Sequence, residues 1–301
     1  MSVGLAMALV VWAAVVVLGA ALTRPDSPTR ERAIPVALVG LSAAFLVPIE
    51  AVFARFVVAL LVALALGRTL DLALRPHALG MLARVWMFVA LFDVRQARRG
   101  PPGLDPRELA WLLPHLGLLS LGGFGVLVWA PSLAGLAHWL VRWASGLLLC
   151  YGLVESVHST LLMGYRAFGV QHAPINLRPI VSTTLVEFWG RRWNRAVATW
   201  LRDYAFFPLA RRGRVQLGIA AAFAASTALH FWVSWVPLGV SAGLIMGSFF
   251  VVHGVALVIE RKLGVAHWPV ALRRTWTSAV LVSTSPLFVE PMLRILVALA
   301  T

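Results

Sequence analysis

The sequence predicts an all-α integral membrane protein, a polytopic helical bundle of about eight transmembrane helices with interfacial helices between some of them. Of its 301 residues, 60% are hydrophobic and 13% are charged, whereas a soluble domain has about 45–50% and about 25%. Its mean hydropathy is +0.85. Apolar runs of about twenty residues recur along the chain, and each is long enough to cross a bilayer as a helix. No repeat or polar linker divides them, so we expect one membrane domain over residues 1–301.

The predicted spans follow one another with short connections. No basic residue precedes the first run, which has about twenty residues, so we expect a retained helix rather than a signal peptide. The second and third runs are short and meet at residues 48–50, where we expect a tight hairpin or tilted helices. The apolar stretch 79–92 is too short to predict a crossing, and it could be interfacial or re-entrant. The predicted spans are 3–22, 34–48, 51–66, 109–130, 134–155, 217–236, 239–259 and 277–300.

Arginine carries nearly all of the formal net charge of +14, and Lys262 is the only lysine. Eight spans with the N-terminus outside place every basic cluster on one face, provided that 79–92 does not cross. The opposite connections, near residues 49, 132 and 237, are almost uncharged. By the positive-inside rule we expect the clusters on the cytoplasmic face of a bacterial inner membrane. The clusters lie within 24–32, 68–84, 95–107, 191–214 and 261–274.

The long segment 156–216 differs from the spans because arginines and aromatic residues alternate along it. Tryptophan and arginine settle at the headgroup level of a bilayer, with the rings at the boundary and the charges in water. The segment could be a membrane-surface helix with anchoring residues, or a cytoplasmic entrance that recruits an anionic, lipid-like substrate. Nucleic-acid binding is the poorer account, because these aromatic residues have a bilayer beside them. We therefore expect the bilayer, and no nucleic acid, as the partner.

His230 is the most prominent of the ionisable residues within the predicted spans, in the string STALHFWVSW. Counted from the basic loop, it lies roughly 20 Å into the membrane. Its charged form is costly there, so we expect a neutral imidazole that can accept a proton. That is the state a general base needs. The alternative is a histidine that only forms a hydrogen bond with a neighbouring helix.

Other polar residues are weaker candidates. Glu155 and His158 share a helix face and could pair, but a solvated pair is the more common outcome near the end of a span. His253 lies on the next span, nearer the cytoplasm. Ser226 precedes His230 by one turn, yet a helix serine usually bonds its own backbone and no third group orients it, so we reject a hydrolase triad. Bundle-facing pairs are expected for Glu50, Arg55, Arg142 and Glu290.

Several membrane chemistries are excluded by missing motifs. The sequence has no HxxxH or HxxHH histidine boxes for a di-iron desaturase and no HExxH for a zinc protease. It has no P-loop for a nucleotide-driven pump. Cys150 is the sole cysteine, which excludes an internal disulfide and thiolate metal sites. We expect no metal and no bound cofactor.

The string EFWGRRWN at residues 187–194, followed by RDYAFFPL and then by His230 in an apolar helix, resembles the wax-synthase branch of the membrane-bound O-acyltransferases. In that family an F-W-x-R-W-[NH]-type motif on the cytoplasmic side precedes an intramembrane histidine by a few dozen residues. The specific match covers about residues 187–235. One departure is the run 226–229, Ser-Thr-Ala-Leu, where the family often has a Ser-Gly pair.

The resemblance implies transfer of a fatty acyl group from an acyl thioester, with acyl-CoA as the expected co-substrate, to the hydroxyl of a lipophilic alcohol. His230 would remove the hydroxyl proton during attack, and Asn194 would orient the donor or bond near the thioester oxygen. Arginines would contact the CoA phosphates. A long-chain alcohol, a sterol and a secondary metabolite all remain open as acceptors. The expected substrate-binding residues are Trp189, Arg191, Arg192, Trp193 and Arg195.

Two functions from other classes are alternatives to acyl transfer. A transporter or exporter of a hydrophobic metabolite would use intramembrane histidine and glutamate residues as a proton relay. Against it, no pair of helices interrupted by glycine or proline recurs in matching halves of the chain. A scaffold without chemistry would use the aromatic and basic segment only as a membrane anchor.

Overall fold

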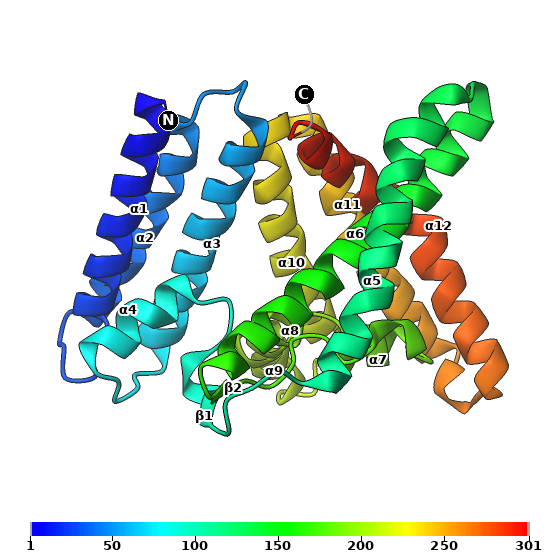
Figure 1. Cartoon of the computed structure of the whole chain (residues 1–301). Coiled ribbons are helices and arrows are strands. Elements are labelled where there is room, and N and C mark those ends of the chain that lie inside the picture. Colours follow the sequence, from blue (N-terminus) through cyan, green and yellow to red (C-terminus); the bar gives the residue numbers. More distant parts are fainter. Residues whose placement is uncertain (1, 300–301) are drawn as a thin grey trace. The chain divides into compact units, whose positions relative to one another are not determined.

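The structure, a computed structural model, describes residues 2–299 and consists almost entirely of helices (Figure 1). Within these described residues, seven helical segments are long enough and apolar enough to cross a membrane, which confirms the prediction of an all-α polytopic membrane bundle. The helix α5 (Pro106–Phe124) continues through π- and 3-10-helical turns to Ser132. The others are α1 (Val3–Leu22), α3 (Val52–Leu74), α6 (Gly135–Ala167), α10 (Val215–Leu238), α11 (Val240–Lys262) and α12 (Val270–Val297).

Shorter elements connect the long helices. Among the described residues, the sheet consists of two antiparallel strands, β1 (Arg98–Arg99) and β2 (Val170–Gln171). The short helices are α2 (Ala33–Gly40), α4 (Met81–Val89), α7 (Leu185–Glu187), α8 (Arg195–Leu201) and α9 (Phe207–Ala210).

Contacts divide the chain into two compact units. Unit 1 comprises the chain up to Arg95, residues 229–244 and the chain from Arg294 onward, and unit 2 comprises residues 96–228 and 245–293. Each unit has its own packed interior.

The second predicted span, 34–48, is shorter than a regular transmembrane helix. It forms the eight residues of α2 and then six residues of 3-10 helix, Leu41–Leu46. Together these extend about 24 Å, because the 3-10 helix rises further per residue. The segment runs antiparallel to α1, since Gly40 lies against Val15, and Gly4 lies against Leu46. It therefore returns the chain to the end of unit 1 where α1 begins (Figure 1).

The stretch 79–92 contains only the nine residues of α4, about 13 Å of helix, which is far less than the thickness of a hydrocarbon core. Leu82 is 83% exposed and Trp86 is 48% exposed, while Arg84 on the other side of the helix is 1% exposed. The length of α4 favours the interfacial alternative, with the apolar side chains toward the membrane boundary.

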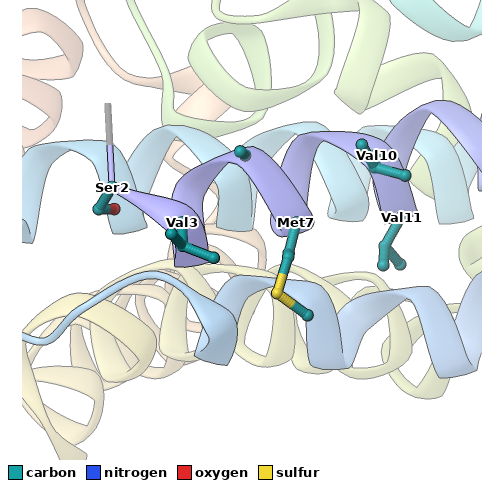
Figure 2. A pocket seen from close by; sticks show the side chains of 6 residues that line it. Ser2, Val3, Met7, Val10 and Val11 are labelled. Atoms are coloured by element: carbon teal, nitrogen blue, oxygen red, sulfur yellow. The ribbon is translucent and has the colours of Figure 1, made fainter.

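Unit 1 is packed through small side chains. Ala8 of α1 and Ala59 of α3 are fully buried in one cluster, together with alanines of the 3-10 segment. The outer side of α1 instead exposes Val3, Met7 and Val10, which line a shallow apolar hollow (Figure 2). In a bilayer such a face is covered by lipid tails.

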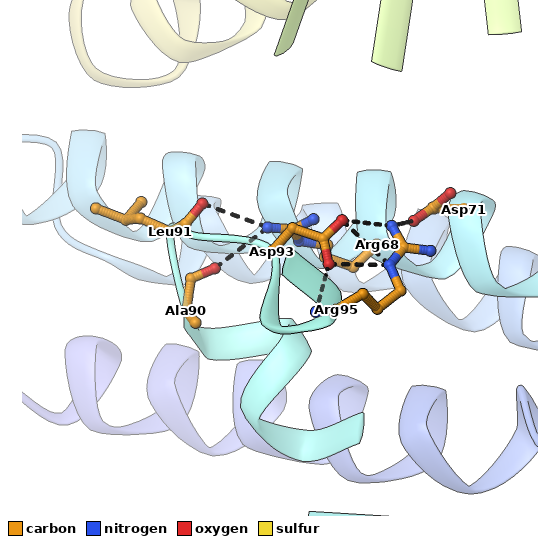
Figure 3. A network of polar contacts seen from close by, with 6 residues as sticks. All are labelled: Arg68, Asp71, Ala90, Leu91, Asp93 and Arg95. Carbon is orange, nitrogen blue, oxygen red and sulfur yellow. Dashed lines mark hydrogen bonds and ion pairs between the residues drawn. The ribbon is translucent and has the colours of Figure 1, made fainter. Parts of the chain in front are cut away.

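An ion-pair network joins the chain after α4 to α3 within unit 1 (Figure 3). Arg95 Nη2 lies 2.5 Å from Asp71 Oδ2 and 2.6 Å from Asp93 Oδ2. Arg68 Nη2 donates to the carbonyl oxygens of Ala90 and Leu91, at 3.4 and 3.3 Å. Burial alone would raise the pKa of Asp93, but the hydrogen bonds from the Arg95 side chain and backbone lower it below its usual value.

In unit 2, α5 and α6 approach each other closely at glycines. A Cβ added at Gly152 would lie 2.5 Å from the backbone nitrogen of Leu119, and one at Gly122 would lie 2.4 Å from that of Leu149. Small residues at such points let membrane helices come into close contact. By contrast, Gly117, also on α5, faces open space.

Bundle-facing pairs were expected for four polar residues, and the structure shows such a pair for some of them. Arg142 Nε of α6 donates to Glu290 Oε2 of α12 at 2.9 Å, so this expected pair exists within unit 2. Arg55 lies over the ring of Phe45, 5.5 Å from its centroid. For Glu50 the expectation was wrong, because it lies exposed in the turn before α3 and pairs with no residue that the structure describes.

We expect Gly152→Ala to lower the free energy of unfolding by about 1–3 kcal/mol, because the new methyl group collides with α5 backbone that cannot move aside. The matched control, Gly117→Ala, should leave stability unchanged or raise it slightly, since alanine favours a helix more than glycine does. Thermal unfolding of the purified proteins in detergent, followed by tryptophan fluorescence, measures both. Equal melting temperatures for the two variants would contradict the close contact.

We expect Asp93→Asn to lower the free energy of unfolding by about 1–3 kcal/mol at neutral pH, because it breaks a partly buried charged pair. A carboxyl group with a lowered folded-state pKa stabilises the protein above its unfolded-state pKa, and this stabilisation is lost as pH falls through the folded value. The melting temperatures of wild type and variant should therefore converge below about pH 4. Asp26→Asn, at an exposed position of the same unit, is the control. A constant difference at all pH values would contradict the ion pair.

Candidate functional site

The motif segment at residues 172–195 folds back on itself between α6 and α8. The backbone N–H of Leu177 donates to the carbonyl of Arg192 at 2.8 Å, and that of Arg195 donates to the carbonyl of Ile175 at 2.8 Å. Residues 175–177 therefore lie alongside residues 192–195. This pairing places Asn176 beside Asn194.

Glu187 closes the turn that carries the motif. Thr184 caps α7, its hydroxyl oxygen accepting the N–H of Glu187 at 3.0 Å. The Glu187 carboxylate in turn accepts the N–H of Thr183 at 2.8 Å and the Nε of Arg192 at 2.7 Å. Burial alone would raise the pKa of Glu187, but the bonds from Thr183 and Arg192 lower it below its usual value. The two ends of the motif turn are thus held by one carboxylate.

Glu260, at the end of α11, attaches the start of α7 to the membrane helices. Its carboxylate accepts the N–H groups of Leu185 and Val186 at 2.7 and 3.0 Å. It also accepts the indole N–H of Trp276 from α12, at 3.1 Å. A buried carboxylate at a helix N-terminus satisfies N–H groups that have no partner within the helix.

Trp189 reaches from the motif into the interior of unit 2. Its indole N–H donates to His253 Nδ1 at 3.1 Å, and His253 Nε2 lies 2.9 Å from the hydroxyl of Thr284. Since Nδ1 accepts, the proton of a neutral His253 ring lies on Nε2. The ring of Trp189 packs against Phe249 and Phe250. Both nitrogens of the fully buried His253 are used for structure.

Asn194 adopts a left-handed backbone conformation, with φ 39° and ψ 59°, at the N-cap of α8. Its backbone N–H donates to Asn176 Oδ1 at 2.9 Å, and its own Oδ1 accepts the N–H of Val197 at 3.3 Å. Because Oδ1 serves as the cap, the amide nitrogen Nδ2 points away from the helix. Within residues 2–299, this half-buried Nδ2 donates to no other group. Asn194 therefore offers two N–H donors that the fold does not use.

Asn176 is held by Glu155, a residue expected to be solvated. Asn176 Nδ2 donates to Glu155 Oε1 at 2.9 Å, and Trp111 Nε1 donates to Glu155 Oε2 at 3.0 Å. Glu155 is 1% exposed and His158 is 6% exposed. The expectation of a solvated pair was therefore wrong, because the motif segment folds over this end of α6 and covers it.

The arginines of the motif divide into two groups. Arg192 binds Glu187 and the carbonyl of Leu177, and Arg195 Nη1 donates to the carbonyl of Pro174 at 3.0 Å. Arg191 is exposed and forms no hydrogen bond or ion pair with a residue that the structure describes. Trp193 stacks on Phe188, with ring centroids 5.7 Å apart. Of the predicted phosphate-binding arginines, Arg191 is the one that the fold leaves available.

His230 lies half-buried in the part of α10 that belongs to unit 1, whereas Asn194 belongs to unit 2. The turn of helix around His230 is held to its own unit by Trp232, whose indole N–H donates to the carbonyl of Ala59 at 3.3 Å. The ring of Trp232 also contacts Phe45 edge-on. Ser226 falls in unit 2.

Sequence reasoning missed the supporting residues Asn176, Trp111 and Glu260. A loop asparagine, a tryptophan in an apolar run and a glutamate beside a basic cluster are all ordinary features of a membrane protein. The pairing of residues 175–177 with 192–195 alone reveals that Asn176 bonds to Asn194.

Part of the chain, including the motif, is similar to a known protein family. Residues 169–252 match the membrane bound O-acyl transferase family. The chain is 31% identical over 146 residues to the probable long-chain-alcohol O-fatty-acyltransferase 3 of Arabidopsis thaliana, covering 42% of this chain and 41% of that protein. It is 32% identical over 93 residues to the probable alginate O-acetylase AlgI of Pseudomonas aeruginosa, covering 29% of this chain and 16% of that protein. The chain spans about two fifths of the length of the plant relatives.

We expect Arg192→Gln to loosen the motif turn, because it removes the bonds to Glu187 and to the carbonyl of Leu177, worth about 1–2 kcal/mol together. Chymotrypsin should then cleave at residues 188–193 faster than in wild type, as measured by mass spectrometry of the fragments. Arg191→Gln has the same change of charge and should be cleaved at the wild-type rate. Equal acceleration in both variants would contradict the structural division between these arginines.

Proposed function

Residues 169–252 match the membrane bound O-acyl transferase family, and from this similarity we propose that the protein transfers a fatty acyl group from acyl-CoA to the hydroxyl of a lipophilic acceptor. The similarity to proteins named long-chain-alcohol O-fatty-acyltransferases supports a long-chain alcohol as acceptor. A sterol or a secondary metabolite has the same reacting hydroxyl. The single observation that carries the proposal is Asn194, a motif residue whose carboxamide is held by its own helix while both Nδ2 hydrogens remain available.

In the proposed reaction, His230 is the general base. A neutral imidazole takes the hydroxyl proton as the acceptor oxygen attacks the thioester carbonyl carbon. The carbon–sulfur bond then breaks, and the CoA sulfur leaves and receives the proton from the imidazolium. The products are an ester and free CoA, with no net change in protons on the enzyme.

Asn194 is proposed to stabilise the negative charge that develops on the thioester oxygen. Amide N–H groups directed at such an oxygen lower the barrier because they are positioned before the reaction begins. The left-handed conformation of Asn194 is one that asparagine tolerates better than most residues. The bond from its backbone N–H to Asn176 holds the backbone, and the bond accepted by its Oδ1 from Val197 orients the carboxamide.

Binding of acyl-CoA is proposed to use the basic and aromatic face of the motif. Arg191 is available for a CoA phosphate, and the expected contributions of Arg192 and Arg195 are secondary because both already bind the protein. Trp193 and Trp189 are proposed to shape the wall of the donor site. The apolar chains of both substrates would lie among the membrane helices, where little water is present to hydrolyse the thioester.

The protein is an integral, multi-pass membrane protein, as its seven long apolar helices indicate. We propose that the basic loops face the cytoplasm of a bacterial cell, in accordance with the positive-inside rule. Acyl-CoA is a soluble cytoplasmic metabolite, so this orientation would present the motif to its donor.

We expect His230→Ala to lower the rate of ester formation about 10²–10⁴-fold, because the general base is lost. Membranes or nanodiscs containing the protein are supplied with labelled acyl-CoA and a long-chain alcohol or sterol, and the ester is measured by mass spectrometry. His267→Ala, at an exposed loop position, is the control for loss of a histidine and should keep wild-type activity. Unchanged ester formation in the His230 variant would refute the catalytic role. Absence of ester from wild type with every acceptor would favour the transporter.

A further inference from the structure

Next to Asn194 lies a series of buried and partly buried hydrogen bonds that the acyl-transfer mechanism does not use. It runs from Trp111 of α5 to Glu155 of α6, from Glu155 to Asn176, and from Asn176 to the backbone N–H of Asn194. All of these residues belong to unit 2. Three distances of 3.0, 2.9 and 2.9 Å link a membrane helix to the candidate oxyanion donor.

The charge in this series lies on Glu155. Both of its carboxylate oxygens accept hydrogen bonds from neutral donors, the pattern of an ionised carboxylate. Glu155 is 1% exposed and Asn176 is 5% exposed. A buried charge is costly unless its hydrogen bonds are made, so the carboxylate strongly fixes the side chain of Asn176, with Nδ2 toward Glu155 and Oδ1 toward Asn194.

His158, also on α6, binds the residue next to Asn176 in the same segment. Its Nε2 accepts the N–H of Ile175 at 3.1 Å. The proton of a neutral ring is then on Nδ1, which lies 3.9 Å from Glu155 Oε2. The carbonyl of Ile175 accepts the N–H of Arg195. Glu155 and His158 therefore fix both residues of the 175–176 pair, and through them the backbone on either side of the Asn194–Arg195 peptide.

On the basis of the proposed function, we infer that Glu155 and Asn176 are positioning residues that fix Asn194 in the left-handed conformation from which its Nδ2 meets the thioester. They act through Asn194 and do not touch the substrates. The buried carboxylate sets the direction of each hydrogen bond, because it can only accept. Asn176 must then donate to Glu155, which leaves its oxygen for the N–H of Asn194.

Each hydrogen bond in this series has a fixed donor and acceptor, so the acid and the amide at positions 155 and 176 can be exchanged as a test. Glu155→Gln retains the shape of the side chain but turns an N–H donor toward either Trp111 or Asn176, both of which also donate. Asn176→Asp places a second carboxylate against Glu155 and removes the donated bond. Combined, the two changes restore every bond: Gln accepts from Trp111 and donates to Asp, which accepts the N–H of Asn194.

The test measures kcat and the KM for acyl-CoA of the purified full-length protein in nanodiscs. Each single variant should lower kcat about 10–100-fold, since an unmet buried hydrogen bond displaces Asn194, while KM changes by less than about threefold. The double variant should recover kcat to within about fivefold of wild type. The control is Ser159→Ala, one turn after Glu155 on α6, which removes a partly buried hydrogen bond to Glu108 of α5. It should reduce thermal stability and leave kcat unchanged.

A second cycle separates positioning from general stability. In an Asn194→Ala background there is no carboxamide to orient, so Glu155→Gln should cause no further loss of kcat. Three results would each overturn the positioning role while leaving the acyltransferase activity intact. They are a further loss of kcat from Glu155→Gln in the Asn194→Ala background, a Glu155→Gln/Asn176→Asp variant no more active than the single variants, and an equal loss of kcat in Ser159→Ala. A wild type that forms no ester with any acceptor would instead overturn the proposed function.

Discussion

The motif segment is mostly irregular backbone, and those of its N–H groups that are buried from water must find partners within the protein. Carboxylates meet this requirement, and of the three involved Glu155 and Glu260 are buried while Glu187 is half-buried. Glu260 accepts the N–H groups of Leu185 and Val186, Glu187 accepts that of Thr183, and Glu155 acts through Asn176 on that of Asn194. In a chain with a formal net charge of +14, its few acidic residues thus stabilise the backbone of this segment.

Arginine performs the converse task in unit 1, where carbonyl groups at the ends of helices need donors. Arg84, 1% exposed, donates to the carbonyls of Thr23 and His77 at 2.5 Å each and to that of Leu79 at 3.0 Å. The five donors of a guanidinium suit this role, since one side chain can bond several carbonyl groups from separate segments. Arg84, which lies in one of the basic clusters, therefore has a structural role.

The hydrogen bonds within the motif segment distinguish residues that support the fold from residues whose polar groups are not used by it. Trp189 and His253 complete each other's hydrogen bonds, and Arg192 closes the turn. Among the described residues, Arg191 and Nδ2 of Asn194 form no hydrogen bond within the protein. A reactive group works best when its neighbours are locked by packing and hydrogen bonds, and the motif has this organisation: most of its members hold the turn while few face outward.

The sequence alone predicted the membrane fold and the order of the long helices, because lipid solvation requires long apolar helices. It also predicted the resemblance of residues 187–235 to the membrane-bound O-acyltransferases, because a local motif consists of consecutive residues. It could not determine that residues 34–48 end in a 3-10 helix. Nor could it show that Glu155 is covered or that Asn176 holds Asn194. Those features depend on which segments meet in space. A glutamate that becomes buried cannot be distinguished in the sequence from one that stays solvated, because its burial depends on the motif segment folding over it.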